Sequence, residues 1–151
     1  MADHQGSLVS DPRAAIQYTD VTGTYAVAKS DDVEQNIFGW ASVAITKSGE
    51  EVLDHHADLI DPADLAAAAY TFVIEANGSG EDHNGAPTDG ILVESMVFTK
   101  DKLAAMGLPE DSLPLAWWVG FHIPDRAAYE TAKASKSAFS IEGTAYREEI
   151  A

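Results

Sequence analysis

The 151-residue chain contains no cysteine. This absence excludes disulfides, thiolate metal sites and cysteine nucleophiles from its chemistry. No apolar run approaches the roughly 18 residues that a membrane-spanning helix needs, and the first residues show no charged-then-apolar signal pattern. We therefore expect neither a membrane partner nor secretion through a signal peptide.

Basic residues are scarce, because nine Lys and Arg oppose 25 Asp and Glu and the formal net charge is −16. The few cations are scattered along the chain, whereas binding of a phosphate backbone needs clustered Lys and Arg. We therefore expect no nucleic-acid partner. A basic or neutral polypeptide partner fits this charge, and solubility alone would also explain it.

Length and composition indicate one soluble globular domain, with 46% hydrophobic and 23% charged residues in 16.1 kDa. Residues 1–22 lack sustained periodicity and are expected to form a flexible N-terminal arm. Residues 23–151 are expected to form the single domain. There is no internal repeat.

Runs rich in β-forming residues alternate with helical segments. The predicted strands are 24–28, 37–45, 52–53, 91–98, 115–123 and 138–146. The predicted helices are 62–76, 100–106 and 125–134, and the first two begin after the N-cap residues Asp61 and Thr99. Loops are expected at 30–32 and 85–90. The segment 91–98 is largely apolar and is expected to be buried on both faces. Connection lengths favour antiparallel pairing in an α+β or β-barrel domain.

Ser140 is a candidate nucleophile, because it alternates with Phe139 and Ile141 on a predicted strand and so points away from their apolar face. A serine hydroxyl attacks well only when a base within hydrogen-bond reach takes its proton, and histidine is the usual base. His83 lies in a glycine-flanked loop after a helix, a position that functional residues favour. On its own, His83 would be read as a solvent-exposed loop histidine.

Six segments of the chain occur in a characteristic order. They are Phe38-Gly39-Trp40-Ala41-Ser42-Val43, Asp54 to Pro62, Gly80-Glu81-Asp82-His83, Leu92-Val93-Glu94-Ser95, Trp117-Trp118-Val119-Gly120-Phe121 and Phe139-Ser140-Ile141. In this order they resemble the XkdF-type phage prohead (capsid maturation) serine proteases, over residues 24 to 147. That family is related to the herpesvirus assemblin-type proteases, whose fold is an antiparallel β-barrel wrapped by helices.

The resemblance implies an antiparallel β-barrel flanked by two or three helices in a protease-like domain, with Ser140 as nucleophile and His83 as base. It implies an endopeptidase that cleaves the phage scaffold or the scaffold-like arm of the major capsid protein. The reaction would take place in the host cytoplasm, inside the assembling prohead, with no cofactor and no metal. Self-cleavage and assembly into a homo-oligomer remain open.

If a catalytic triad exists, its third member has to be a carboxylate, because the herpesvirus enzymes use a second histidine after the serine and no histidine follows Ser140 here. Glu94 is the first choice, since it is a charge inside an apolar strand eleven residues after His83. A buried carboxylate needs a partner, and an imidazolium would supply one. Asp58 and Glu142 are the reserves. Oxyanion donors would be backbone N–H groups or an arginine such as Arg147.

Two other classes of function stay open. Glu142 stands where prohead proteases often carry glycine, and this departure points to a non-catalytic capsid or scaffold component on the same fold. His55, His56, Asp58 and His83 could instead serve a metal-dependent hydrolase, but their spacing matches no motif such as His-Glu-x-x-His. His122 is expected to be a half-buried structural histidine.

Overall fold

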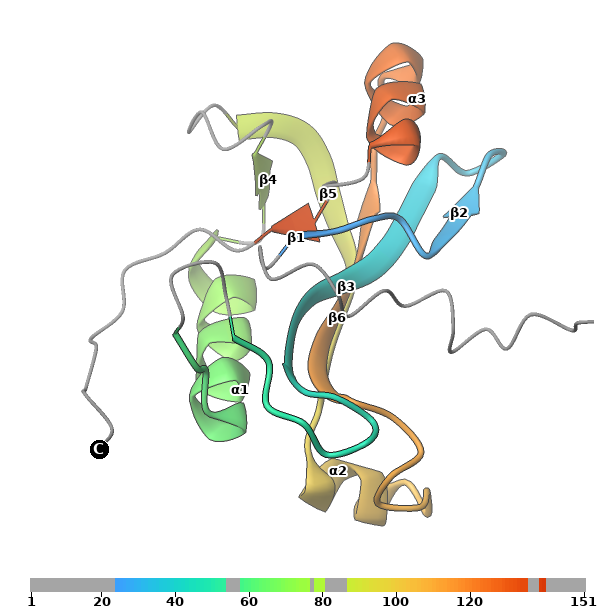
Figure 1. Cartoon of the computed structure of the whole chain (residues 1–151). Helices are drawn as coiled ribbons and strands as arrows, with labels where there is room; N and C mark the ends of the chain where they lie inside the picture. Colours follow the sequence, from blue (N-terminus) through green and yellow to red (C-terminus); the bar gives the residue numbers. More distant parts are fainter. Residues whose placement is uncertain (1–23, 54–57, 77, 81–86, 136–138, 141–151) are drawn as a thin grey trace, which may run out of the picture.

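The computed structural model describes residues 24–53, 58–76, 78–80, 87–135 and 139–140. The expected N-terminal arm, 1–22, lies outside these ranges. The elements, shown in Figure 1, are β1 (Thr24–Tyr25), β2 (Lys29–Asp31), β3 (Asn36–Ile45), α1 (Pro62–Thr71), the π-helical turn η1 (Phe72–Ala76), β4 (Gly78–Gly80), β5 (Pro87–Phe98), α2 (Lys100–Ala105), β6 (Leu115–His122), α3 (Arg126–Ala134) and β7 (Phe139–Ser140).

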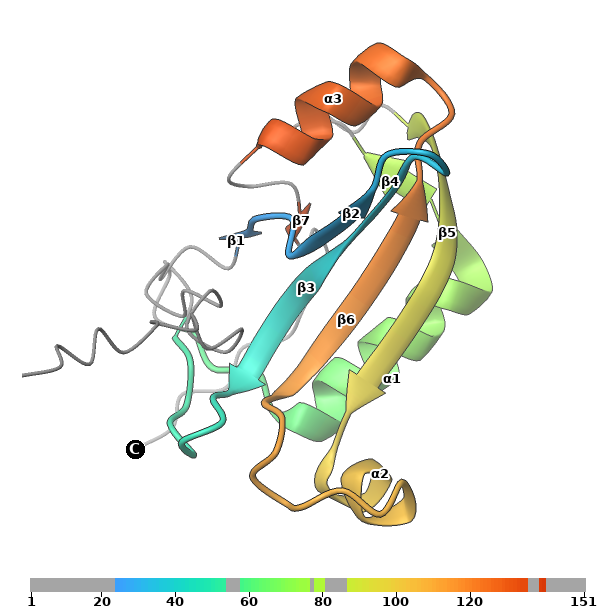
Figure 2. The same cartoon turned by 90° about the vertical axis from the view of Figure 1, so that its right-hand side faces the viewer.

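The main sheet is antiparallel and has the strand order β2-β3-β6-β5-β4, while β1 and β7 form a separate two-stranded antiparallel sheet. Figure 2 shows β3, β6 and β5 side by side, with α1 behind them. The prediction of an antiparallel α+β domain with two or three helices is therefore confirmed, and the described residues form the three α-helices α1, α2 and α3.

The prediction of a barrel is wrong for the described residues, whose sheet is open. Closure requires the two outermost strands to pair along their length. Here the outermost strands, β2 and β4, have only three residues each. A helix replaces the missing second layer, because Leu65 and Ala69 of α1 join the hydrophobic core.

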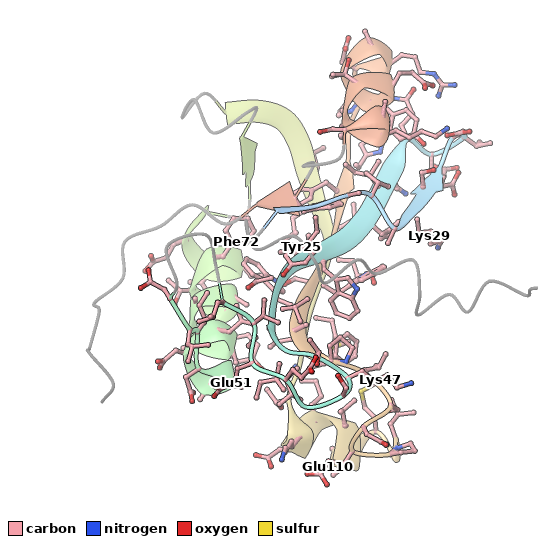
Figure 3. The ribbon with its side chains drawn as sticks, viewed as in Figure 1. Tyr25, Lys29, Lys47, Glu51, Phe72 and Glu110 are labelled. Carbon is pink, nitrogen blue, oxygen red and sulfur yellow. The ribbon has the colours of Figure 1, made fainter. Side chains whose placement is uncertain are left out.

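The two faces of the sheet carry different side chains. Every second residue of β6, namely Trp117, Val119 and Phe121, points to the face of the sheet against which α1 packs. On this face the ring of Phe72 contacts Trp117 edge-on, with ring centroids 5.3 Å apart. We call this the helix face. Figure 3 shows Tyr25 and Phe72 on the same side of β3, so β1 also lies on this face.

The opposite face carries Trp40, Trp118 and Phe38, and we call it the aromatic face. Trp40 and Trp118 are cross-strand partners, and their rings meet at 5.1 Å and 80°. Trp117 and Trp118 therefore point to opposite faces, as strand alternation predicts.

Strand β5 differs from its prediction in two ways. It begins at Pro87 inside the expected loop, and it is not buried on both faces, because Ile91 is 55% and Val93 50% exposed. The physical reason is its position near the edge of the sheet. Its neighbour β4 pairs with it only between Pro87 and Ile91, so most of β5 has a described strand on one side alone.

Segment 30–32 also differs from its prediction, because Lys29–Asp31 pairs with β3 as a hairpin strand. The carboxylate of Asp31 accepts hydrogen bonds from the backbone N–H groups of Val33 and Glu34. Gln35, at φ 56°, supplies the left-handed residue that completes the turn. These local contacts turn an acidic stretch into a hairpin.

The helix starts agree with the sequence. Asp61 accepts a hydrogen bond from the N–H of Ala63 at 2.8 Å, and Thr99 accepts one from Lys102 at 3.3 Å. The helical region that starts at Pro62 ends at Ala76, as predicted, but its last turn is the π-helical η1. None of the described helices is long and apolar enough to cross a membrane.

Candidate functional site

Ser140 lies on β7, which pairs antiparallel with β1 through Thr24–Ser140 and Tyr25–Phe139. Phe139 is only 4% exposed, and its ring stacks on Phe121 with centroids 6.4 Å apart and planes at 24°. The backbone at Ser140 is thus fixed on one side by pairing with Thr24 and on the other by its neighbour Phe139, which is buried in the core. We call the packing of Phe139 the anchor of β7, and it places β7 on the helix face.

The anchor depends on a glycine of β3. An ideal Cβ built on Gly39 would lie 2.6 Å from Cε2 and 2.7 Å from Cδ2 of Phe139, and 3.0 Å from the carbonyl oxygen of Ala26. Any larger residue would collide with the ring. Two motifs about one hundred residues apart in the sequence, around Gly39 and around Ser140, therefore meet in space.

Glu94 lies on the aromatic face and is exposed, so the expectation of a buried carboxylate is wrong. Its Oε1 accepts a hydrogen bond from Nε1 of Trp118 at 3.0 Å. Its Cβ lies 3.1 Å from an ideal Cβ built on Gly120, which confirms the face to which it points. An indole N–H, rather than an imidazolium, is its described partner.

The sheet separates Glu94 from the strand that carries Ser140. Phe139 packs on the helix face and Glu94 projects from the aromatic face, so the structure does not bring Glu94 and Ser140 together. Asp58, the first reserve, is half-buried in the segment that leads into α1, and its role as the third catalytic residue stays a prediction.

Several candidate residues lie outside the described ranges, as does the side chain of Ser140. The residues are His55, His56, His83, Glu142 and Arg147. The pairing of Ser140 with His83 therefore stays a prediction. Within the described ranges, no group of three or more His, Asp or Glu side chains is placed to hold a metal ion.

Two polar residues near the motifs have structural partners. Oγ of the half-buried Ser95 accepts a hydrogen bond from Nε1 of Trp117 at 2.9 Å. His122 is half-buried, as expected, and its Nδ1 lies 3.1 Å from Oδ1 of Asn36. Both contacts tie neighbouring strands of the sheet together.

The sequence reasoning missed a polar cluster that fixes α3 to the β2–β3 turn. Oδ1 of Asp32 accepts hydrogen bonds from Tyr129 Oη at 2.6 Å and Lys133 Nζ at 2.7 Å. The bond from Lys133, followed by that from Tyr129, holds the pKa of Asp32 below its usual value. Burial, followed by the bond to Asp32, raises the pKa of Tyr129. The four-residue spacing of Tyr129 and Lys133 on one helix face was the available signal.

An open hollow of about 480 Å³ lies beside β5. Tyr70 of α1 and Val73 and Ile74 of η1 line one side, and residues 92–95 line the other. Leu92 is the cross-strand partner of Phe121, the residue on which Phe139 stacks. The hollow is therefore one strand away from the anchor of β7.

No protein-family model, curated protein or solved structure matches the chain. The interpretation of the site therefore rests on the motifs and on the geometry above.

Proposed function

We propose that this chain is a serine endopeptidase of the phage prohead type, in which Ser140 is the nucleophile and His83 the base. The observation that carries the proposal is the seating of Phe139 between Gly39 and Phe121. It joins three of the motifs that carry the family resemblance, and it fixes the backbone next to Ser140. Acyl transfer depends on such positioning of the attacking oxygen.

In this mechanism, Ser140 Oγ attacks the scissile carbonyl while His83 takes its proton. The histidine then gives that proton to the leaving amine, and water hydrolyses the acyl-enzyme by the same route in reverse. A carboxylate would orient the histidine, and Asp58 becomes the preferred candidate because Glu94 projects from the face of the sheet opposite β7. The substrates would be the phage scaffold, the major capsid protein or the chain itself, in the host cytoplasm inside the assembling prohead.

A second candidate is a non-catalytic capsid or scaffold component on the same fold. The observation that favours it is the position of Glu94, which lies across the sheet from β7 and is hydrogen-bonded to Trp118. In that case the segments that carry the family resemblance would stabilise the fold and would have no catalytic role.

Covalent labelling separates the two candidates. A fluorophosphonate probe should modify the wild-type protein, and peptide mapping should place the adduct on Ser140. Ser140→Ala and His83→Ala should each reduce labelling by several orders of magnitude, and the double variant by little more, because such residues act as a unit. Ser48→Ala is the matched control, since Ser48 lies in an exposed turn after β3.

Wild-type protein that is folded by circular dichroism, yet is neither labelled nor able to cleave itself or an added peptide library, would favour the non-catalytic candidate. Cleavage that survives Ser140→Ala but stops with a chelator would support the metal-dependent hydrolase instead.

A further inference from the structure

The outer edge of β5 is covered only in part by the strands that the structure describes. Among the described residues, β4 pairs with β5 only between Pro87 and Ile91, and residues 92–98 have no strand on that side (Figure 2). Every second residue of such an edge presents its N–H and C=O groups outward. These groups recognise another polypeptide strand, independently of its side chains.

The hollow described above borders this edge. Its walls are apolar and accessible, because Ile74 is 79%, Tyr70 51% and Val93 50% exposed. A strand placed beside residues 92–95 would direct a side chain toward these three residues. A bulky apolar side chain would bury surface there that water now covers.

Charge favours a basic polypeptide at this edge. Glu94, which borders the hollow, is exposed, and the whole chain has a formal net charge of −16, although Nζ of Lys102 lies 3.3 Å from Oη of Tyr70 on the opposite side of the hollow. A lysine or arginine in the added strand would complement Glu94. A second copy of this chain would instead bring like charges together, so self-pairing is disfavoured.

We propose that residues 92–98 dock an extended polypeptide segment. The segment adds to the sheet as a strand, places a bulky apolar side chain against Tyr70 and Ile74, and places a basic residue near Glu94. This inference rests on the proposed function, because the segment is taken to be the substrate of Ser140.

The edge and β7 are connected through the middle of the sheet. Leu92 of β5 pairs with Phe121 of β6, and the ring of Phe139, the neighbour of Ser140, stacks on Phe121.

Binding is tested with full-length Ser140→Ala protein, which removes turnover. The probe is a short fluorescein-labelled peptide of alternating leucine and threonine with a lysine at one end, followed by fluorescence anisotropy. Ile74→Glu should weaken binding about tenfold or more, because a charge replaces apolar surface in the hollow. Val33→Glu is the matched control, since Val33 is 88% exposed in the β2–β3 turn.

Two altered peptides test the mode of binding. A peptide N-methylated at alternate amides should not bind, because it cannot pair with a strand edge. In the second altered peptide, glutamine replaces the lysine of the parent peptide, and this exchange should weaken binding. High salt should abolish the difference in affinity between the parent peptide and the glutamine peptide.

Equal binding of the N-methylated peptide, or no binding of the parent peptide, would overturn the inference. Sedimentation that shows a dimer dissociated by Ile74→Glu would also overturn it and assign the edge to self-association. Fluorophosphonate labelling is independent of this edge. If Ser140 is labelled but the peptide does not bind, only the proposed docking edge is refuted. If the peptide binds but Ser140 is not labelled, the docking edge is supported and the protease function is refuted.

Discussion

Replacing Gly39 with alanine tests whether the anchor of β7 is needed for reactivity at Ser140. The new methyl group would lie 2.6 Å from the ring of Phe139, well inside contact distance. If the ring stays, overpacking of this kind costs about 1–3 kcal/mol. If the ring leaves the core, the lost burial of an aromatic side chain costs about 1.5–3 kcal/mol.

Both routes predict that the free energy of unfolding falls by about 2 kcal/mol in Gly39→Ala. Urea denaturation followed by far-UV circular dichroism measures this loss. The variant should also lose most of its fluorophosphonate labelling per mole of folded protein, because β7 is displaced. Adding Phe139→Leu should recover part of the stability, since the smaller side chain relieves the overlap.

Gly120→Ala is the matched control on the aromatic face. Its methyl group would lie 2.6 Å from Cδ1 of Phe38, so a similar loss of stability is expected. Labelling should persist in the folded fraction, because β7 is untouched. Gly120 also abuts Glu94, so persistent labelling would weaken the case for that carboxylate. Equal loss of labelling in both glycine variants would show that labelling of Ser140 depends on the overall stability of the protein and not on the anchor of β7.

Two further predictions concern carboxylates. The pKa of Asp32 is lowered in the folded protein by Lys133 and Tyr129, so its contribution to stability is present above its unfolded pKa of about 3.9 and is lost as pH falls through the lower folded pKa. Asp32→Asn should therefore flatten the acid side of a plot of Tm against pH below about pH 4, and an unchanged plot would contradict this. Asp58→Asn should slow fluorophosphonate labelling more than Glu94→Gln, and the reverse order would restore Glu94 as the residue that orients the histidine.

The helix starts were predictable because the signals are local. Asp61 and Thr99 cap the backbone within three residues of themselves, so the sequence around each cap contains the necessary information. The strand at Phe139-Ser140 was also predictable from its alternation, and it appears as β7. The expected base, His83, lies outside the described residues, so the triad itself stays a prediction.

The open sheet was not predictable, because it depends on which strands become neighbours. Gly78-Ser79-Gly80 has little intrinsic strand preference, yet it pairs with β5 as β4. The apolar run around Glu94 suggested burial on both faces, but the edge position left Glu94 in solvent. Burial of a strand is a property of its neighbours, and its own composition does not determine it.

The placement of the indoles has a spectroscopic consequence. All three tryptophans lie on the adjacent central strands β3 and β6. Trp40 and Trp118 form an edge-to-face pair at 5.1 Å, and Trp117 is hydrogen-bonded to Ser95. Tryptophan emission therefore reports on the middle of the sheet and gives no direct signal from α3 or β7. An ellipticity change that precedes the emission change would reveal the outer elements detaching as a separate cooperative unit.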